Sequence, residues 1–397
     1  MLTSFPQTLA RWAGVVFTAC ALGSLAFSAE QLSEAELGRW RHPALSSPPI
    51  RLPGVFDQQT VVVLPDGRFI SVPPEGNATI VSTDNGQTWS KPRPIRPANS
   101  PVVPTRGPLI LTKSGVLVLP FETIGGLETR WDEAKRDWAP AFHKGQNLWF
   151  TRSTDQGETW AEPQQYTGGG DEGHYGTIVS SIQTGSGHIV VPIQVTLQNP
   201  GHWGMYGFVS ADDGKTWSRS NLIDLGGNGH HDGAIEATVA ELSNGRLMML
   251  IRTGYGKFWE AYSDDHGYNW LEVRPSQLDS AAAPGYMKRL ASGRLVLIWS
   301  RLAMEGAAIP PNSGPSAAYV NGVRSQRREF SMTYSDDDAK SWSSPVVITR
   351  QAKGSASYPF ILEPHPGELW IWTRYGSMPS VYLKLSEHDL VGLKRAP

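Results

Sequence analysis

Two glycine-rich loops concentrate side chains that can transfer protons. Residues 226–233 read Gly-Gly-Asn-Gly-His-His-Asp-Gly and place His231 and Asp232 directly before a strand-like apolar run. Residues 168–176 bring His174 to the same position before the preceding run. Histidine titrates near neutral pH and can act as a general acid or base. Glycine loops with solvated polar side chains are the structural alternative for both segments.

These side chains do not follow a metal-binding pattern. The regular ligand spacing of a zinc site does not occur around the histidines. The single cysteine, Cys20, lies in an N-terminal apolar run, so the sequence predicts neither disulfides nor a cysteine nucleophile in the mature chain. We expect no metal and no cofactor.

An eight-residue motif repeats along the chain and indicates how these loops are positioned. The pattern Ser-x-Asp-x-Gly-x-x-Trp covers residues 82–89, 153–160, 210–217, 263–270 and 335–342. Within such a motif, the Asp side chain can accept backbone N–H bonds across a tight turn, and Gly supplies a positive φ. The last copy has Ala339 in place of Gly, which predicts a slightly altered turn.

Paired apolar runs around a glycine turn alternate with these motifs. They cover residues 60–70, 109–119, 178–192, 236–250, 287–299 and 360–372. Each pair reads as a β-hairpin. Six hairpins and five motifs predict an all-β fold, a six-bladed β-propeller with four strands per blade whose last blade lacks the motif. Residues 36–53 are expected to add an outer strand, and residues 30–397 form one domain.

Composition and charge narrow the class of protein. Hydrophobic residues make up 40% of the chain and charged residues 18%, which supports a large core. The net charge of −2 without a basic stripe argues against nucleic acid as a partner. Residues 1–29 carry Arg11 before a short apolar run and read as a signal peptide. We expect a secreted or periplasmic protein that leaves the membrane after cleavage, with an uncleaved anchor as the alternative.

The five motifs resemble the Asp boxes, or BNR repeats, of sialidases (neuraminidases) and related propellers. In that family the boxes are structural and lie away from the site, so their five tryptophans are not expected to bind carbohydrate. The resemblance implies a sialidase-like glycoside hydrolase that releases a terminal acidic sugar, sialic acid, from a glycan. It also implies a site at one end of the central channel.

The same resemblance implies particular site residues. The family places its catalytic Glu and one of three carboxylate-binding arginines at the two ends of a strand pair, where Glu236 and Arg252 stand here. Arg327 precedes the last box by eight residues, like a second such arginine, with Arg328 as a competitor one residue away. Tyr358 begins the last blade and resembles the family's nucleophile.

Physical chemistry makes this set coherent. An arginine fork can hold the carboxylate of a sialic acid through two bonds. The substrate's own charge repels a carboxylate nucleophile, whereas the phenol of Tyr358 can pass its proton to Glu236 and attack. The plainer alternatives are an ion pair between Glu236 and Arg252 inside the channel, and a core tyrosine with a bonded hydroxyl.

The first blade departs from the family pattern. The family's first triad arginine stands nine residues before the turn of the first hairpin, a position that Asp57 occupies here. Arg51, in Arg-Leu-Pro, and Arg106, in Arg-Gly-Pro, are the candidates to replace it. The family's acid/base Asp has no counterpart between residues 73 and 80, where Glu75 is the nearest carboxyl group.

Three functions follow from these observations. The first is a sialidase in which His231 or Asp232 replaces the missing acid and His174 lines the substrate site. The second is a divergent propeller glycosidase or lyase that acts on another acidic sugar, such as a uronate, through histidines. The third is a noncatalytic carbohydrate-binding propeller, because a fold does not fix a function. A hydrogen bond between Tyr358 and Glu236 would favour the first.

Overall fold

The computed structural model describes twelve segments of the chain, which are residues 30–31, 39–42, 50–51, 59–73, 76–105, 107–123, 131–140, 147–168, 173–307, 327–351, 356–375 and 378–393. The predicted signal peptide lies outside them. Across these segments, no helix has both the length and the apolar character needed to cross a membrane.

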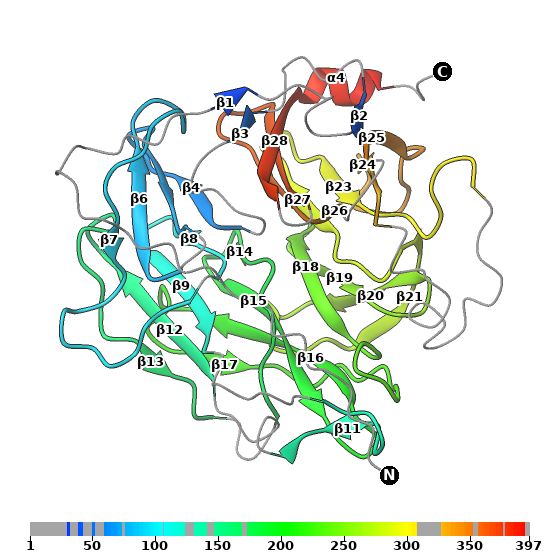
Figure 1. The fold of residues 1–397 in the computed structure, drawn as a ribbon, viewed down its shortest axis with the longest axis horizontal. Helices are drawn as coiled ribbons and strands as arrows, with labels where there is room; N and C mark the ends of the chain where they lie inside the picture. The colour runs from blue at the N-terminus through cyan, green and yellow to red at the C-terminus, as the bar shows by residue number, and fades with distance from the viewer. Residues whose placement is uncertain are drawn as a thin grey trace, which may run out of the picture.

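Six antiparallel sheets follow one another around a ring, as predicted (Figure 1). Blade 1 contains β4 (Val61–Val63), β5 (Phe69–Ser71), β6 (Ala78–Ser82) and β7 (Arg93–Pro94). Blade 2 contains β8 (Ile110–Leu111), β9 (Leu117–Glu122), β12 (Leu148–Ser153) and β13 (Gln164–Gln165), with a hairpin of β10 (Trp131–Asp132) and β11 (Asp137–Trp138) inserted before β12. Blade 3 contains β14 (Ile182–Gln183), β15 (Ile189–Leu197), β16 (His202–Ser210) and β17 (Ser218–Arg219).

The remaining blades use longer strands. Blade 4 contains β18 (Ile235–Glu241), β19 (Leu247–Arg252), β20 (Lys257–Ser263) and β21 (Glu272–Asp279). Blade 5 contains β22 (Tyr286–Arg289), β23 (Leu295–Trp299), β24 (Glu329–Ser335) and β25 (Val346–Gln351). Blade 6 contains β26 (Ala356–Leu362), β27 (Glu368–Tyr375) and β28 (Met378–Ser386), followed by the helix α4 (Glu387–Gly392).

Strands that precede blade 1 complete the last two blades. β2 (Arg39–Arg41) pairs with β25 at the outer edge of blade 5. β3 (Ile50–Arg51) pairs with β28, and β1 (Glu30–Gln31) pairs with β3, which extends blade 6 outward. The predicted outer strand therefore exists, but it is divided between two blades. Segments from both ends of the described chain thus share one sheet.

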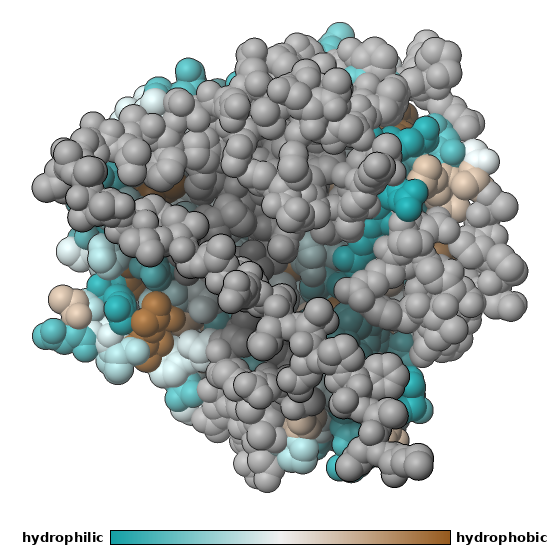
Figure 2. Space-filling model, viewed as in Figure 1, coloured by the Kyte–Doolittle hydropathy of each residue, from teal (hydrophilic) through white to brown (hydrophobic). Residues whose placement is uncertain are grey.

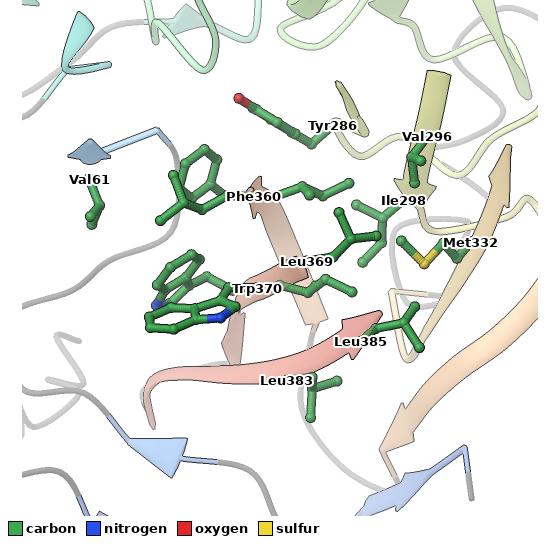
Figure 3. Packing of buried hydrophobic residues seen from close by; sticks show 14 of the residues in the cluster. Val61, Tyr286, Val296, Ile298, Met332, Phe360, Leu369, Trp370, Leu383 and Leu385 are labelled. Atoms are coloured by element: carbon green, nitrogen blue, oxygen red, sulfur yellow. The ribbon is translucent and has the colours of Figure 1, made fainter. Parts of the chain in front are cut away.

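Buried apolar side chains hold neighbouring blades together. The cluster between blades 6 and 1 surrounds Trp370, whose ring centroid lies 5.2 Å from that of Phe69 (Figure 3). Phe360 stacks on Trp372 in the same cluster, at 5.5 Å. Among the described residues, the exposed large apolar side chains are Val103, Leu271 and Val391, which belong to three different segments. On the face seen in Figure 1, Figure 2 shows the described surface as mostly teal to white with separated brown patches.

One side chain also links three blades across the centre of the ring. Gln59 lies directly before blade 1, and its Oε1 accepts the N–H of Ser181 at 2.9 Å and the hydroxyl of Tyr286 at 3.3 Å. Ser181 precedes β14, and Tyr286 begins β22. The inner strands of all six blades line the central channel around this contact.

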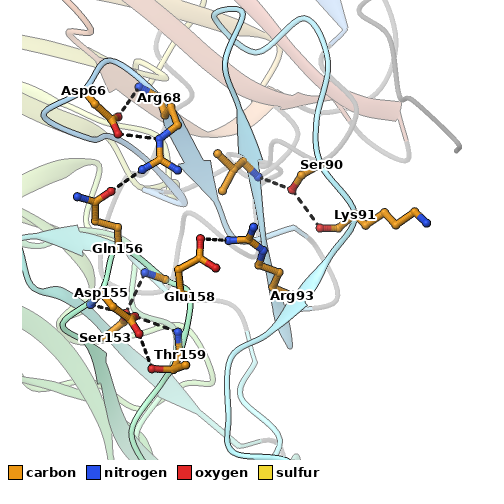
Figure 4. A network of polar contacts seen from close by, with 12 residues as sticks. Asp66, Arg68, Ser90, Lys91, Arg93, Ser153, Asp155, Gln156, Glu158 and Thr159 are labelled. Carbon is orange, nitrogen blue, oxygen red and sulfur yellow. Dashed lines mark hydrogen bonds and ion pairs between the residues drawn. The ribbon is translucent and has the colours of Figure 1, made fainter.

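The Asp boxes form the turns that the sequence predicts. In blade 2, the Thr159 N–H donates to Asp155 Oδ1 at 2.9 Å, and the Ser153 hydroxyl donates to the same oxygen at 2.7 Å (Figure 4). The tryptophan that ends each box then packs toward the preceding blade. Trp217 of blade 3, for example, stacks on Phe150 of blade 2 at 4.1 Å.

The predicted alteration of the fifth turn does not occur. The Ala339 N–H donates to Ser335 Oγ at 2.9 Å, as the glycine does in the other boxes, and Ala339 adopts a φ of 62°. A side chain in this left-handed region is strained by its Cβ. We therefore expect Ala339→Gly to raise the free energy of unfolding by about 0.5–1 kcal/mol, measured by urea denaturation. The reverse change at the equivalent position, Gly267→Ala, should lower it, and a destabilised Ala339→Gly protein would contradict this explanation.

A stacked histidine pair joins blades 3 and 4. The rings of His188 and His266 lie 4.3 Å apart at 3°, and the Ser186 hydroxyl contacts both Nδ1 atoms, at 2.9 and 3.2 Å. Burial and then the charge of His266 lower the pKa of His188. The unfolded chain consequently binds this proton more readily, so the contribution to stability is complete above the unfolded pKa of about 6.5 and is lost as the pH falls.

This pair predicts a pH-dependent melting temperature. We expect Tm to decrease between about pH 7 and about pH 5, and to decrease less in His188→Gln, because that variant lacks the group with the lowered pKa. The matched control is His388→Gln, since His388 is exposed on α4. Identical pH profiles for His188→Gln and the wild type would show that the stacked pair does not contribute.

Candidate active site

Glu236 and Tyr358 both occupy irregular positions near the start of an inner strand. The register of β18 against β19 shifts between Ile235 and Ala237, which makes Glu236 the bulged residue. The register of β26 against β27 shifts between Ser357 and Phe360, and Tyr358 adopts a φ of 55°. A β-bulge redirects side chains and is common beside active sites. The two bulges thus aim side chains from blades 4 and 6 at each other.

Glu236 has three polar partners, two at its carboxylate and one at its backbone N–H. Its Oε1 accepts the Tyr358 hydroxyl at 2.7 Å, and its Oε2 accepts Nη1 of Arg252. Gln194 of β15 accepts the Glu236 backbone N–H through Oε1 at 2.8 Å. Glu236 and Arg252 are 4% and 3% exposed, so this ion pair is almost excluded from bulk solvent. The sequence offered an ion pair between Glu236 and Arg252, and a core tyrosine with a bonded hydroxyl, as alternatives to a catalytic role. The structure contains both contacts at the same carboxylate.

The charges around Tyr358 define what its hydroxyl can do. Burial raises the pKa of Tyr358, and the negative charge of Glu236 raises it further, against the opposing charges of Arg252 and Arg327. The phenol therefore holds its proton at rest. A reaction at this oxygen requires a base, and Glu236 is already within hydrogen-bond distance.

Arg327 reaches the same site from the segment before β24. Its side chain is 8% exposed, and Nη2 donates to the backbone carbonyl of Ala282. Its charge acts on Tyr358, and it lines the same cavity as Glu236 and Arg252. Two guanidinium groups thus approach the Tyr358 hydroxyl from separate blades.

A cavity of about 200 Å³ lies over these groups, and His174 and His231, the two histidines predicted from the sequence, line it. His174 is buried in its wall, and His231 is partly exposed there. The structure therefore brings both loops to the same cavity as Tyr358 and Glu236. Glu122, at the end of β9, also lines this cavity.

Asp232 stands apart from this group. Its side chain is buried, and Oδ2 accepts the N–H of Asn228 at 3.1 Å within the loop of residues 226–233. The Asp232 carbonyl also accepts the N–H of Trp203 at 3.0 Å. Asp232 is not among the described residues that line the cavity. These bonds shape the loop that carries His231, and a catalytic role of Asp232 stays a prediction.

Arg51 and Arg106 are the two candidates for the first triad arginine, and the structure describes the backbone of Arg51 only. The backbone of Arg51 pairs with Val381 of β28, at the outer side of blade 6, where β28 and β27 separate it from β26. The side chain of Arg51 lies outside what the structure describes, so its place in the triad stays a prediction. Arg106, Asp57 and Glu75 lie outside the described residues.

An aromatic wall on the cavity was not predicted. Trp138 of the inserted hairpin packs against Trp203 of β16 with centroids 4.7 Å apart, and its Nε1 donates to the carbonyl of His202 at 3.0 Å (β11 and β16 in Figure 1). The His230 ring lies 5.2 Å from the Trp138 ring, and all three rings line the cavity. Flat apolar rings suit the faces of a sugar. The sequence offered a signal, since these tryptophans belong to no Asp box.

The fold and the site define a six-bladed Asp-box propeller with a Tyr–Glu–Arg cluster at one end of its channel. Residues 131–371 match the family model of the BNR repeat-like domain, and residues 80–91 match the BNR/Asp-box repeat. The chain therefore belongs to the BNR repeat-like family, and its sialidase-like character is confirmed.

Individual relatives agree with this family. A sialidase of Clostridium perfringens is 27% identical over 218 residues, which cover 50% of this chain and 53% of that protein. The chain thus spans about half the length of this curated relative. Two solved structures share the fold. A mutant of the NanB sialidase from Streptococcus pneumoniae has a TM-score of 0.56 at 15% identity, over 90% of this chain and 71% of its own. An α-L-arabinanase of Penicillium chrysogenum complexed with arabinobiose has a TM-score of 0.52 at 13% identity, over 86% and 99%.

Proposed function

We propose that the protein is an exo-acting glycoside hydrolase of the sialidase type that releases a terminal sialic acid from a glycan. The observation that supports this most strongly is the 2.7 Å hydrogen bond from Tyr358 to Glu236, with Arg252 on the other carboxylate oxygen. The sialidase relative gives independent support.

The proposed reaction begins with attack by the Tyr358 oxygen on the anomeric carbon. Glu236 accepts the phenol proton as this bond forms, which compensates for the raised pKa of Tyr358. The bond from the anomeric carbon to the leaving glycan breaks, and the leaving oxygen takes a proton from an acid in the cavity. Water then attacks the tyrosyl-bound sugar and gives a proton back to that acid, which now acts as a base, while the bond from the anomeric carbon to the Tyr358 oxygen breaks and the phenol regains its proton from Glu236. Arg252 and Arg327 hold the carboxylate of the sugar.

We assign the proton for the leaving oxygen to His231. His231→Asn should lower kcat about 100-fold on a sialyl disaccharide, because the leaving sugar needs a proton. The same variant should retain most activity on 4-nitrophenyl sialoside, whose leaving group departs without one. Glu122→Gln is the matched control, since Glu122 lines the same cavity. If Glu122→Gln alone gave this pattern, the acid would be Glu122 and the assignment to His231 would be wrong.

A lyase or glycosidase acting on a uronate is the second candidate. The observation in its favour is that His174 and His231 line one cavity with Tyr358. A uronate also carries a carboxylate that Arg252 and Arg327 can bind. The fold itself is shared with an arabinanase, so it does not exclude another sugar.

An assay of the purified protein with three fluorogenic glycosides tests the two candidate functions together. The 4-methylumbelliferyl derivatives of sialic acid, glucuronic acid and arabinose differ in the sugar alone. We expect turnover of the sialoside only, between about pH 4 and about pH 8. Folded protein that leaves the sialoside intact would contradict the sialidase proposal, and turnover of the glucuronide would establish the second candidate.

We also propose that the protein acts outside the cytoplasm. The apolar segment within residues 1–29 supports export. N-terminal sequencing of protein recovered from an expressing culture tests this. A start near residue 30 is expected, and an intact Met1 on protein retained in the cytoplasm would contradict export.

A further inference from the structure

Hydrogen bonds between the His174 backbone and Thr196 of β15 fix the position of His174 in the cavity wall. The His174 N–H donates to Thr196 Oγ1 at 2.7 Å, and the Thr196 N–H donates to the His174 carbonyl at 2.9 Å. The next residue, Tyr175, bridges to Val195 on the same strand. His174 is 4% exposed. The ring therefore projects from a segment that is held along a central strand of blade 3.

The side chain of Asn147 meets this segment from blade 2. Its Oδ1 accepts the Tyr175 N–H at 2.9 Å, and its Nδ2 donates to the Tyr175 carbonyl at 2.7 Å. If the oxygen and nitrogen of this amide were exchanged, the amide oxygen would face the Tyr175 carbonyl and the amide nitrogen would face the Tyr175 N–H. Neither contact could be a hydrogen bond, so the orientation of Asn147 is determined. The second hydrogen of Nδ2 is then available to His174 Nε2, which lies 3.0 Å away.

An amide nitrogen can only donate, so His174 Nε2 must accept. A neutral imidazole that accepts at Nε2 carries its proton on Nδ1. We infer that Asn147 is a positioning residue that holds His174 as the neutral tautomer protonated at Nδ1. Adding a proton at Nε2 would direct two hydrogens at each other and break the bond to Asn147.

This protonation state assigns His174 a restricted part in the proposed reaction. A ring without a proton at Nε2 cannot deliver one from that atom to a leaving glycan. His174 therefore serves as a neutral wall of the substrate site, and proton delivery falls to another group. That consequence rests on the proposed function, whereas the tautomer itself does not.

Other titratable groups share the cavity with His174. Those in the described residues are Glu122, Glu236, Arg252, Arg327, His230, His231 and Tyr358. The two carboxylates and the two guanidinium groups offset each other in charge. The direct contact with Asn147 therefore favours the tautomer with its proton on Nδ1.

Nuclear magnetic resonance of the full chain with ¹⁵N-labelled histidine tests the inference. The chain has ten histidines, and the ring signal that disappears in His174→Gln identifies His174. We expect its two ring nitrogens to report a proton on Nδ1 and none on Nε2 near pH 7. Asn147→Asp, which replaces the donor by an acceptor of the same shape, should move a proton to Nε2.

The outcomes separate this inference from the proposed function. A wild-type His174 protonated at Nε2 near pH 7 would overturn it, whatever the enzyme hydrolyses. If Asn147→Asp does not fold, Asn147→Ala should still convert the single tautomer to a mixture, and an unchanged signal would overturn the inference as well. Absence of sialoside turnover, in contrast, would leave the tautomer result standing.

Discussion

Tyr358→Phe is expected to lower kcat for a sialoside by about three orders of magnitude or more, because it removes the proposed nucleophilic oxygen and keeps the ring. The lost hydroxyl is the one that donates to Glu236 at 2.7 Å. Glu236→Gln should cause a similar loss, since an amide cannot accept the phenol proton. Steady-state kinetics on the fluorogenic sialoside measures both variants.

Blade 4 offers a matched control for this prediction. Tyr262 donates its hydroxyl to Glu260 at 3.0 Å, and burial together with the charge of Glu260 raises the pKa of Tyr262 to about 12. Like Tyr358, this tyrosine donates its hydroxyl to a glutamate, but it is not among the described residues that line the cavity. Tyr262→Phe should leave kcat unchanged. Equal losses in Tyr262→Phe and Tyr358→Phe would indicate a general defect in the fold and contradict the role given to Tyr358.

Arg252→Met is expected to lower the free energy of unfolding by about 3–5 kcal/mol, because it leaves the buried carboxylate of Glu236 without its ion-pair partner. Neutralising that carboxylate in the same chain should reverse much of the loss. The double variant Glu236→Gln with Arg252→Met is therefore expected to be more stable than Arg252→Met alone. Urea denaturation of the four proteins in this cycle measures the coupling.

A surface ion pair provides the comparison. Arg93 pairs with Glu158, and the two side chains are 42% and 54% exposed. Arg93→Met should cost less than about 1 kcal/mol, because water already solvates this pair. If Arg252→Met cost no more than Arg93→Met, the carboxylate of Glu236 would not be a desolvated group, and the electrostatic description of the site would be wrong.

The fold was predictable because its signals repeat. Each Asp box combines a fixed turn geometry with a tryptophan at a fixed spacing, and each inner hairpin alternates with a box. Ala339 shows the limit of this reasoning, since the sequence suggested an altered turn there and the hydrogen bonds of Ser335 and Asp337 preserve the ordinary one. The surrounding box overrides the preference of a single residue.

The site was predictable where position along a blade determines position in space. Glu236, Arg252 and Tyr358 lie at the ends of inner hairpins, so their order in the chain indicates that they converge. Arg51 resembles a family tripeptide, but its backbone belongs to an outer strand. A tripeptide carries no information on which strand of a blade it joins.

Residues contributed by insertions and by strand edges could not be predicted. Trp138 reaches the cavity because the β10–β11 hairpin folds over from blade 2 onto β16 of blade 3. Asn147 bonds to His174 and Tyr175, which are more than twenty residues away in the chain. These contacts depend on how two blades meet, and spacing within one blade does not specify that.

The most direct test of the central claim is covalent trapping with 2,3-difluorosialic acid. Fluorine beside the anomeric carbon slows hydrolysis of a glycosyl–enzyme bond, so the adduct with the nucleophile accumulates. Mass spectrometry of the digested protein then identifies the modified residue. We predict one added sugar on the peptide that contains Tyr358, and none in Tyr358→Phe. An adduct on another residue, or an unmodified wild type that still hydrolyses sialosides, would contradict the role of Tyr358 as the nucleophile.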